Sequence, residues 1–206
     1  MDLLKHTIVF EGLDGAGTTT QRNKLIKYLE EKGKKVFLTN EPTGNMIGRL
    51  IRDILQKKYR TTDKALALLY AADRDDHLYN PEYGIKKHIE DGEYVICDRY
   101  FYSSFAYQGV TLDWSFIAKL NTFPHPEVLI YIDTPTQECI NRIEKRGEEK
   151  ELFEKAEFLQ KVEQGYNKIF STLPDDVRFI KIDGTLSQDA IFEKILVYLV
   201  AINFFG

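Results

Sequence analysis

The stretch that decides the fold runs from Ile8 to Gln21 and reads I-V-F-E-G-L-D-G-A-G-T-T-T-Q. An apolar run followed by glycines and threonines predicts a buried strand, a tight turn and the start of a helix. Because glycine has no Cβ, Gly12, Gly15 and Gly17 let the backbone wrap closely round a ligand. The N–H groups of the first helical turn favour an anion, so we expect a phosphate group here.

This turn matches most of the phosphate-loop pattern G-x-x-x-x-G-K-[ST]. Gly12, Gly17 and Thr19 fit the pattern, whereas Thr18 occupies the lysine position. Since the lysine is the most specific letter of the motif, an ordinary chain reversal stays an alternative for this segment taken alone. The residues expected to bind the phosphates are Gly12, Leu13, Asp14, Gly15, Ala16, Gly17, Thr18, Thr19 and Thr20.

Outward from this turn, strand patterns and helix patterns alternate along the chain. This alternation predicts an α/β fold, a three-layer sandwich around a five-stranded parallel sheet, with Pro124 and Pro126 marking a turn before the fourth strand. Further strands are expected at 35–39, 94–97, 128–133 and 177–182. Helices are expected at 18–32, 47–55, 62–78, 81–91, 103–109, 112–122, 136–170 with a charged break, and 187–202.

The composition indicates one domain spanning residues 1–206, because 206 residues with 43% apolar content form a single substantial core. The net charge is −4 and basic residues are dispersed, which argues against a nucleic-acid partner. No segment approaches the ~18 apolar residues of a membrane span, so no membrane partner is expected. Cys97 and Cys139 lack metal-type spacing, which favours a reducing, cytoplasmic location.

Polar residues follow the predicted strands at the ends where ligands bind in parallel sheets. Glu41-Pro42-Thr43-Gly44 follows the second strand, and Asp98-Arg99 follows the third. The position of Asp98 is typical of a carboxylate that holds a metal beside a phosphate. The charged run 142–151 is either a solvated helix face or, because it lies beyond a strand, a mobile lid over about 142–155.

At this point the chain resembles the thymidylate kinase family, bacterial type, nearly from end to end. The resemblance implies a P-loop nucleoside monophosphate kinase fold and transfer of the γ-phosphoryl group of ATP to dTMP, with Mg²⁺, giving dTDP and ADP for dTTP synthesis. The segments that carry it are Phe10–Gly17, Glu41–Gly44, Ala71–Arg74, Asp98–Tyr100, Ala106–Gly109 and the run beginning at Arg142.

The resemblance also implies roles for individual residues. Thr19 and Asp98 match metal-associated positions, Arg99 matches the arginine that bridges the two phosphates, and Arg142 and Arg146 match lid cations. The residues matching the dTMP site are Asp14 for the sugar 3′-hydroxyl, Tyr70 for stacking on thymine, Arg74, Tyr107 against the sugar 2′ position, Gln108 at the base edge, and Arg99, Pro42 and Ser103. Tyr70 as a plain core residue and Arg99 as a structural partner of Asp98 stay open. A homodimer through residues near 45–57, 62–79 and 102–108 is also implied.

Three positions depart from the family pattern, and each one loses a cation. They are Thr18 in the loop, Asn40 before Glu41-Pro42, and Leu152 in the lid. Losing a charged contact in a phosphoryl-transfer site costs several kcal/mol of transition-state stabilisation. We therefore expect Arg142, Arg146 or Lys150 to compensate. The alternatives are a catalytically impaired nucleotide-binding homologue and a kinase for another nucleoside monophosphate.

Overall fold

A parallel sheet forms the centre of the structure, a computed structural model that describes residues 3–145 and 152–205, with backbone alone for 152–155. The strands of the described chain lie in the order β2-β3-β1-β4-β5, all parallel. This arrangement confirms the predicted α/β class and five-stranded parallel sheet. The strands are β1 (Leu3–Gly12), β2 (Val36–Asn40), β3 (Tyr94–Asp98), β4 (His125–Asp133) and β5 (Arg178–Asp183).

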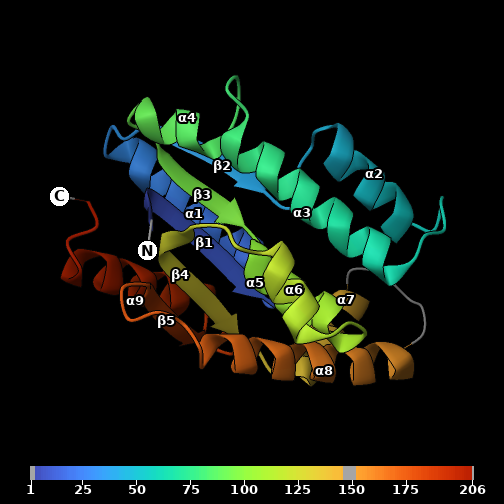
Figure 1. The fold of residues 1–206 in the computed structure, drawn as a ribbon. Coiled ribbons are helices and arrows are strands. Elements are labelled where there is room, and N and C mark those ends of the chain that lie inside the picture. The colour runs from blue at the N-terminus through green and yellow to red at the C-terminus, as the bar shows by residue number, and fades with distance from the viewer. Residues whose placement is uncertain (1–2, 146–151, 206) are drawn as a thin grey trace.

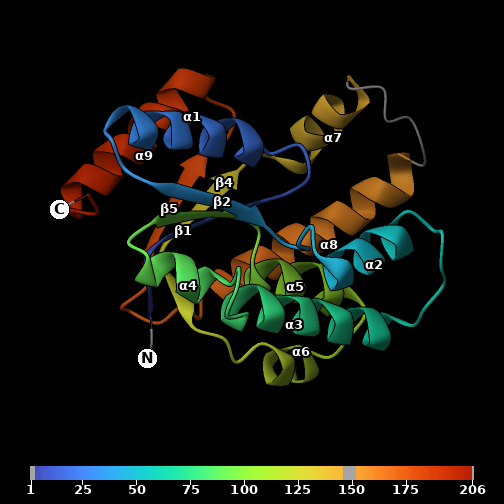
Figure 2. The same cartoon turned by 90° about the horizontal axis from the view of Figure 1, so that it is seen from above.

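Helices cover both faces of the sheet and complete the predicted three layers (Figures 1 and 2). One face carries α1 (Thr18–Glu31) and α9 (Gln188–Ala201). The other carries α3 (Asp63–Tyr79), α4 (Ile85–Glu90), α5 (Phe101–Tyr107) and α8 (Leu152–Phe170). The remaining helices are α2 (Met46–Leu55), the 3₁₀ turn η1 (Gln108–Val110), α6 (Trp114–Leu120) and α7 (Thr136–Glu144).

The middle parts of the central strands β1, β3 and β4 are apolar because both faces of the sheet are covered there. Ile8, Val9 and Phe10 of β1 are buried, as are the central residues of β3 and β4. Phe10 pairs with Asp98, and Gly12 pairs with Ile132, so β1, β3 and β4 end at one edge. The chain crosses from β3 past β1 to β4, and the crevice at such a crossing is where α/β sheets bind ligands.

One expected turn is instead part of a strand. Pro126 was expected to mark a turn, yet it lies inside β4 and is paired with Leu4 of β1. The register shifts between Leu4 and Ile8, and His6 has a φ of 55° with its N–H donating to Glu127 Oε2 at 2.8 Å. A proline fits this strand start because the irregular pairing requires no N–H donor from it.

Trp114, the single tryptophan of the chain, joins α6 to α5 and α8. Its ring lies 5.3 Å from the ring of Phe105, and the Lys168 ammonium group lies 3.9 Å from the ring centroid. A Cβ on Gly109 would come within 2.8 Å of Trp114 Nε1, so only glycine allows this close packing. The indole therefore links three elements on one side of the sheet.

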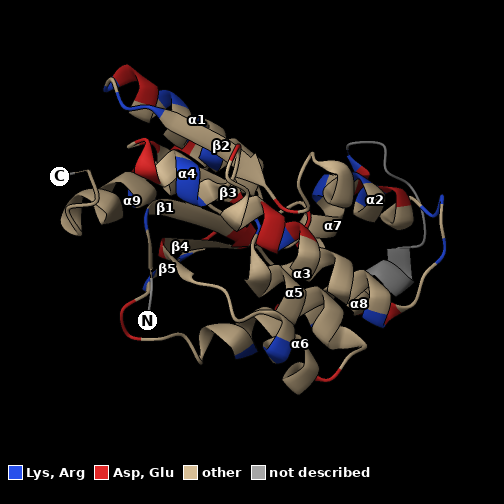
Figure 3. Cartoon of the chain, turned by 45° about the horizontal axis from the view of Figure 1, so that its top comes forward, with Lys and Arg blue, Asp and Glu red and all other residues tan. Residues whose placement is uncertain are grey.

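Acidic and basic residues are mixed over the structure, as their dispersal along the sequence predicts. Basic and acidic segments are interspersed over the ribbon in the view of Figure 3, and the net charge of the chain is −4. Within the part of the chain that the structure describes, we find no helix whose length and apolar character suffice for a bilayer crossing.

Candidate active site

The nine residues expected to bind phosphates run from the last residue of β1, Gly12, through the connection 13–17 into the first turn of α1. Gly15 and Gly17 have φ values of 88° and 105°, a conformation that glycine adopts without strain. A Cβ on Gly12 would lie 2.9 Å from the Ala16 Cβ, which explains the glycine at the first position. The first turn of α1 has no side-chain cap, so its N–H groups are left to bind an anion.

The carbonyl of Ala16 holds this turn in place. The Thr134 hydroxyl donates to it at 3.0 Å, and Arg142 Nη1 donates to it at 3.2 Å. These contacts attach the loop to the ends of β4 and α7, and the Ala16 N–H adds a turn by donating to the Leu13 carbonyl at 2.9 Å. The loop is therefore preorganised for a ligand.

Asp98 ends β3 beside the phosphate loop and is paired with Arg22 of α1. The Arg22 Nη1 atom lies 2.8 Å from Asp98 Oδ2. Among the described residues there is no cluster of three or more His, Cys, Asp or Glu side chains suited to a metal. Mg²⁺ at phosphate-transfer sites needs only one or two protein oxygens because phosphate and water supply the rest. The Asp98 carboxylate and the exposed Thr19 hydroxyl fit that demand.

Arg99, the residue after Asp98, connects the phosphate loop to the helices of the second layer. Its φ is 69°, an unusual value for a side chain of this size. Its Nη2 donates to Asp14 Oδ1 at 2.7 Å, and its Nη1 donates to Ser103 Oγ and Tyr166 OH, each at 3.1 Å. Strained backbone of this kind persists only where the surroundings over-determine it, which is common at functional sites.

Glu11 is the buried carboxylate that organises those surroundings, and it is 0% exposed. Its Oε1 accepts from the N–H of Tyr100 at 2.8 Å and of Ser103 at 3.2 Å. Its Oε2 accepts from Ser103 Oγ and Tyr166 OH, each at 2.7 Å. Burial raises the pKa of Glu11, against the lowering effects of Arg99 and of these donors. Glu11 thus fixes the Ser103 and Tyr166 hydroxyls, which accept hydrogen bonds from Arg99.

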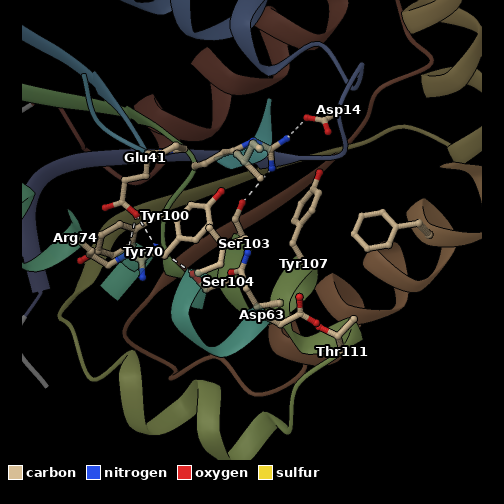
Figure 4. A pocket seen from close by; sticks show the side chains of 16 residues that line it. Asp14, Glu41, Asp63, Tyr70, Arg74, Tyr100, Ser103, Ser104, Tyr107 and Thr111 are labelled. Carbon is tan, nitrogen blue, oxygen red and sulfur yellow. Dashed lines mark hydrogen bonds and ion pairs between the residues drawn. The ribbon is translucent and has the colours of Figure 1, made fainter. Parts of the chain in front are cut away.

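A cavity of about 510 Å³ opens next to Arg99 (Figure 4). It is lined by residues of the phosphate loop, the β2–α2 connection, α3, α5 and α8. All the residues expected at the dTMP site line it, namely Asp14, Pro42, Tyr70, Arg74, Arg99, Ser103, Tyr107 and Gln108. The structure therefore brings together side chains that are more than ninety positions apart in the sequence.

The inner wall of the cavity is a locked ion-pair network around Arg74, which is 1% exposed. Arg74 Nε donates to Glu41 Oε2 at 2.7 Å, and its other nitrogens donate to Ser104 Oγ and Asn121 Oδ1. The same Glu41 contacts His77 Nδ1 at 3.1 Å. Arg74 therefore presents a fixed guanidinium rather than a mobile one.

Aromatic rings also line the cavity. Burial raises the pKa of Tyr70 to about 12, so its phenol is neutral at physiological pH. Burial also raises the pKa of Tyr107, whose ring lies 5.1 Å from the Arg99 guanidinium. Tyr107 OH and Gln108 Oε1 are buried and find no hydrogen-bond partner among the described residues. Buried polar atoms without partners are costly, and both of these residues line the cavity.

The sequence of this chain is similar to those of known proteins. The family model described as Thymidylate kinase matches residues 10–195. The chain belongs to the thymidylate kinase family. A putative thymidylate kinase of Treponema pallidum (strain Nichols) is 43% identical over 203 residues, covering 97% of each chain. Probable thymidylate kinases of Pyrococcus horikoshii and Methanocaldococcus jannaschii are 40% and 37% identical, covering 82% and 93% of this chain and 84% and 94% of their own.

Membership confirms the predicted P-loop kinase fold and makes the chain a nucleoside monophosphate kinase, a transferase that phosphorylates dTMP. The alternatives, an impaired binding homologue and a kinase for another nucleotide, are not favoured. Thr18 and Asn40 depart from the family pattern although the chain is a member of the thymidylate kinase family. Asn40 Nδ2 donates to the Pro42 carbonyl at 2.7 Å.

Of the lid cations expected in this kinase, Arg142 lies within the described residues. Its Nε donates to Glu138 at 2.8 Å, its Nη1 to the Ala16 carbonyl at 3.2 Å, and its Nη2 to the Gly184 carbonyl at 2.9 Å. In this arrangement Arg142 ties the phosphate loop to the turn after β5, and it must release these contacts to serve a phosphate. Arg146, Lys150 and the Leu152 side chain, like most of the lid 142–155, lie outside the described residues.

Several residues of the thymidylate kinase site were not anticipated. Glu11 accepts from Ser103 and Tyr166, and Arg22 pairs with Asp98. Tyr166 and Phe158 of α8 reach Arg99 and the cavity. A charged residue inside the apolar run I-V-F-E-G was the available signal for Glu11. Nothing in the helical pattern of α8 distinguishes its site residues from ordinary core residues.

Proposed function

We propose that this kinase binds ATP on the loop 12–20 and dTMP in the cavity beside Arg99, and transfers the γ-phosphoryl group between them. The bond between the γ-phosphorus and the β–γ bridging oxygen breaks, and a bond to a dTMP phosphate oxygen forms, giving ADP and dTDP. The observation that carries this proposal is the Arg99–Asp14 contact of 2.7 Å, which joins the loop to the cavity. Arg99 is thereby at hand to offset charge on both phosphates.

Each cavity residue has a proposed part in binding the acceptor. Tyr70 stacks on thymine, Arg74 faces the base, and Gln108 bonds the base edge. Asp14 accepts from the 3′-hydroxyl, and Tyr107 fills the space that a 2′-hydroxyl needs. The buried, partnerless oxygens of Tyr107 and Gln108 support this assignment because a bound nucleotide would satisfy them. Pro42 and Ser103 complete the wall.

Mg²⁺ is the proposed cofactor, held by Asp98 and Thr19. When bound, it would supply positive charge that offsets the negative charge of the donor phosphates. The protein's own contribution is the Asp98 carboxylate, kept at the end of β3 by its pairing with Arg22. The free, buried thiols of Cys97 and Cys139 support a reducing cytoplasmic location.

A coupled assay tests the function directly. It measures ADP formation with dTMP, dUMP, dCMP and AMP as acceptors, each with and without Mg²⁺, and identifies the product by chromatography. We expect dTDP as the main product and little turnover after chelation of Mg²⁺. Failure to form dTDP at high enzyme concentration, or a clear preference for AMP, would refute the proposal.

We also propose a symmetric homodimer formed through the face of α2 and α3. The third segment expected at the interface, 102–108, lies on α5, whose side chains are mostly buried. Met46, Leu50 and Leu68 are 79%, 40% and 51% exposed, and the two helices run side by side (Figures 1 and 2). Exposed apolar residues gathered on adjacent helices are typical of an interface between subunits. A second copy of the chain is the proposed occupant of this face.

A further inference from the structure

The phosphate loop of this kinase lacks the lysine that would normally face the donor phosphates, because position 18 is threonine. A triphosphate bound there still needs a cation, since charge neutralisation is the main demand of phosphoryl transfer. We propose that Arg22 supplies this charge from α1. This inference rests on the proposed role of ATP as the phosphoryl donor. It names Arg22 as the group that replaces the loop lysine.

The position of Arg22 on α1 is the first observation. It lies four residues after Thr18, and residues four apart share one face of a helix. The Cα–Cβ bonds of a helix tilt toward its N-terminus, so the Arg22 side chain leans back over the turn that begins at Thr18. That turn is the end of the helix where the phosphate loop binds its anion.

The contact with Asp98 shows where the guanidinium group of Arg22 lies. Asp98 is the last residue of β3 and pairs in register with Phe10, two residues before Gly12. Arg22 Nη1 lies 2.8 Å from Asp98 Oδ2, with the two side chains 18% and 15% exposed. A positive charge is therefore held, largely shielded from water, at the sheet edge from which the loop departs. Shielding makes such a charge more effective than an exposed one.

The other described arginines beside the loop, Arg142 and Arg99, are each held by three partners. Arg142 donates to Glu138 and to the Ala16 and Gly184 carbonyls. Arg99 is bound to Asp14, Ser103 and Tyr166 on the cavity side. Arg22, by contrast, makes its one strong contact with Asp98, and its Nε has a long contact of 3.4 Å to Asn23. Among the described residues Arg22 Nη2 has no hydrogen-bond partner, so it can donate to phosphate oxygens.

The charge balance supports the same assignment. Asp14 is already paired with Arg99 on the cavity side, whereas the Asp98 carboxylate lies beside the loop where ATP is proposed to bind. In a loop without lysine, only Arg22 offsets Asp98 among the described side chains. An arginine at this point gives a planar, multi-donor group in place of a single ammonium, which suits phosphate oxygens.

The experiment measures ATP binding by calorimetry without Mg²⁺, which separates the protein's own charge from the metal. The variants are Arg22→Ala, Thr18→Lys, the double variant, and Arg22→Ala in an Asp98→Asn background. Lys27→Ala is the matched control, because Lys27 lies on the same helix but its side chain is 79% exposed. Binding of dTMP, whose cavity does not include Arg22, reports on correct folding.

We expect Arg22→Ala to weaken ATP binding by roughly 10- to 100-fold while dTMP binding is unchanged. Thr18→Lys should restore most of that loss in the double variant, and Lys27→Ala should change neither affinity. The inference is overturned if Arg22→Ala binds ATP as tightly as Lys27→Ala does. It is also overturned if Arg22→Ala has no effect in the Asp98→Asn background, since Arg22 would then only neutralise Asp98. Loss of dTMP phosphorylation in the wild type would refute the proposed function instead.

Discussion

Arg99 is the single residue on which the proposed chemistry depends most. Its positive φ and its contacts with Asp14, Ser103 and Tyr166 hold the guanidinium between loop and cavity. Its planar guanidinium group carries several N–H donors and can contact two phosphate groups in a way that an ammonium group cannot. A change here should therefore affect the transition state more than binding.

We predict that Arg99→Ala lowers kcat by roughly 10²- to 10³-fold, with a smaller change in dTMP affinity. Arg99→Lys should recover only part of the rate because it keeps the charge but loses the fork. Steady-state kinetics and calorimetry measure the two effects. Arg178→Ala, at the start of β5, is the arginine control and should keep full activity. An Arg99→Ala variant with half the wild-type rate would show that the site is misassigned.

Asp98 should behave in a similar way for a different reason. We predict that Asp98→Ala lowers kcat by at least about tenfold and raises the Mg²⁺ concentration needed for half-maximal rate, since a metal-holding carboxylate is lost. The measurement is a magnesium titration of the rate at saturating ATP and dTMP. An unchanged titration midpoint would remove Asp98 from the metal site.

Glu11 gives a prediction about pH. Burial raises its folded-state pKa, so its favourable contribution to stability is fully present below the unfolded pKa of about 4.5 and is lost as pH rises through the folded pKa. Glu11→Gln does not ionise and lacks this loss. Urea unfolding of both proteins from pH 5 to pH 8 should therefore show the wild type losing stability relative to Glu11→Gln as pH rises. A constant difference would contradict a raised pKa.

Residues that stand in a motif can be predicted from the sequence more readily than the residues that contact them in the fold. Asp14, Tyr70 and Tyr107 could be predicted because each stands in a recognisable segment, and the structure brings them to one cavity. Glu11 and Arg22 act through contacts with residues 76 to 155 positions away. Such pairings depend on how strands and helices are placed in space, which no local pattern encodes.

Among the elements, α5 does the most to shape the cavity. It presents Ser103 and Ser104 from its first turns and Tyr107 from its last, while Glu11 binds the N–H groups at its start. Anchoring one end of a short helix sets the position of the ring at the other end. Tyr107 is therefore a rigid wall and not an adaptable one.

We predict that Tyr107→Ala raises the use of the ribonucleotide TMP relative to dTMP, because truncation opens space for a 2′-hydroxyl. Tyr107→Phe keeps the ring and should keep the discrimination, which makes it the matched variant. The ratio of kcat/KM for the two acceptors is the measurement. If this ratio stays the same in Tyr107→Ala, the steric role of the ring is wrong.

Helices and strands could be told apart from the sequence along the described chain. The residues at which they begin and end could be predicted less well. Apolar periodicity distinguishes α1 from β2 because helices and strands repeat with different periods. The expected helix 81–91 covers only Ile85–Glu90, since Asn80 Oδ1 accepts from the Glu82 N–H and forms a turn first. The start of β4 was missed because a proline usually signals a turn, and the irregular pairing with β1 is visible only in three dimensions.

For the whole molecule, the parallel sheet follows from alternating elements, but the strand order does not. The order places β1 between β3 and β4, and this placement puts the loop beside both Asp98 and Thr134. The oligomeric state likewise depends on surfaces whose sequence pattern also suits a core. It therefore remains a prediction.

We predict that the wild type sediments as a dimer at micromolar concentration and that Leu68→Glu sediments as a ~24 kDa monomer. Placing a charge at the centre of an apolar interface costs more than the interface contributes. Val197→Glu, on the exposed side of α9, is the control and should leave the dimer intact. A wild type that sediments only as a monomer would contradict the proposed interface.

The packing of Trp114 also gives this protein a natural optical reporter. The ammonium of Lys168 next to the indole influences its emission, and Lys168 belongs to α8, whose Phe158 lines the cavity. Any shift of α8 when a nucleotide binds changes the distance between that charge and the only tryptophan. Fluorescence of the unlabelled enzyme, excited at the indole band, can therefore follow acceptor binding in real time.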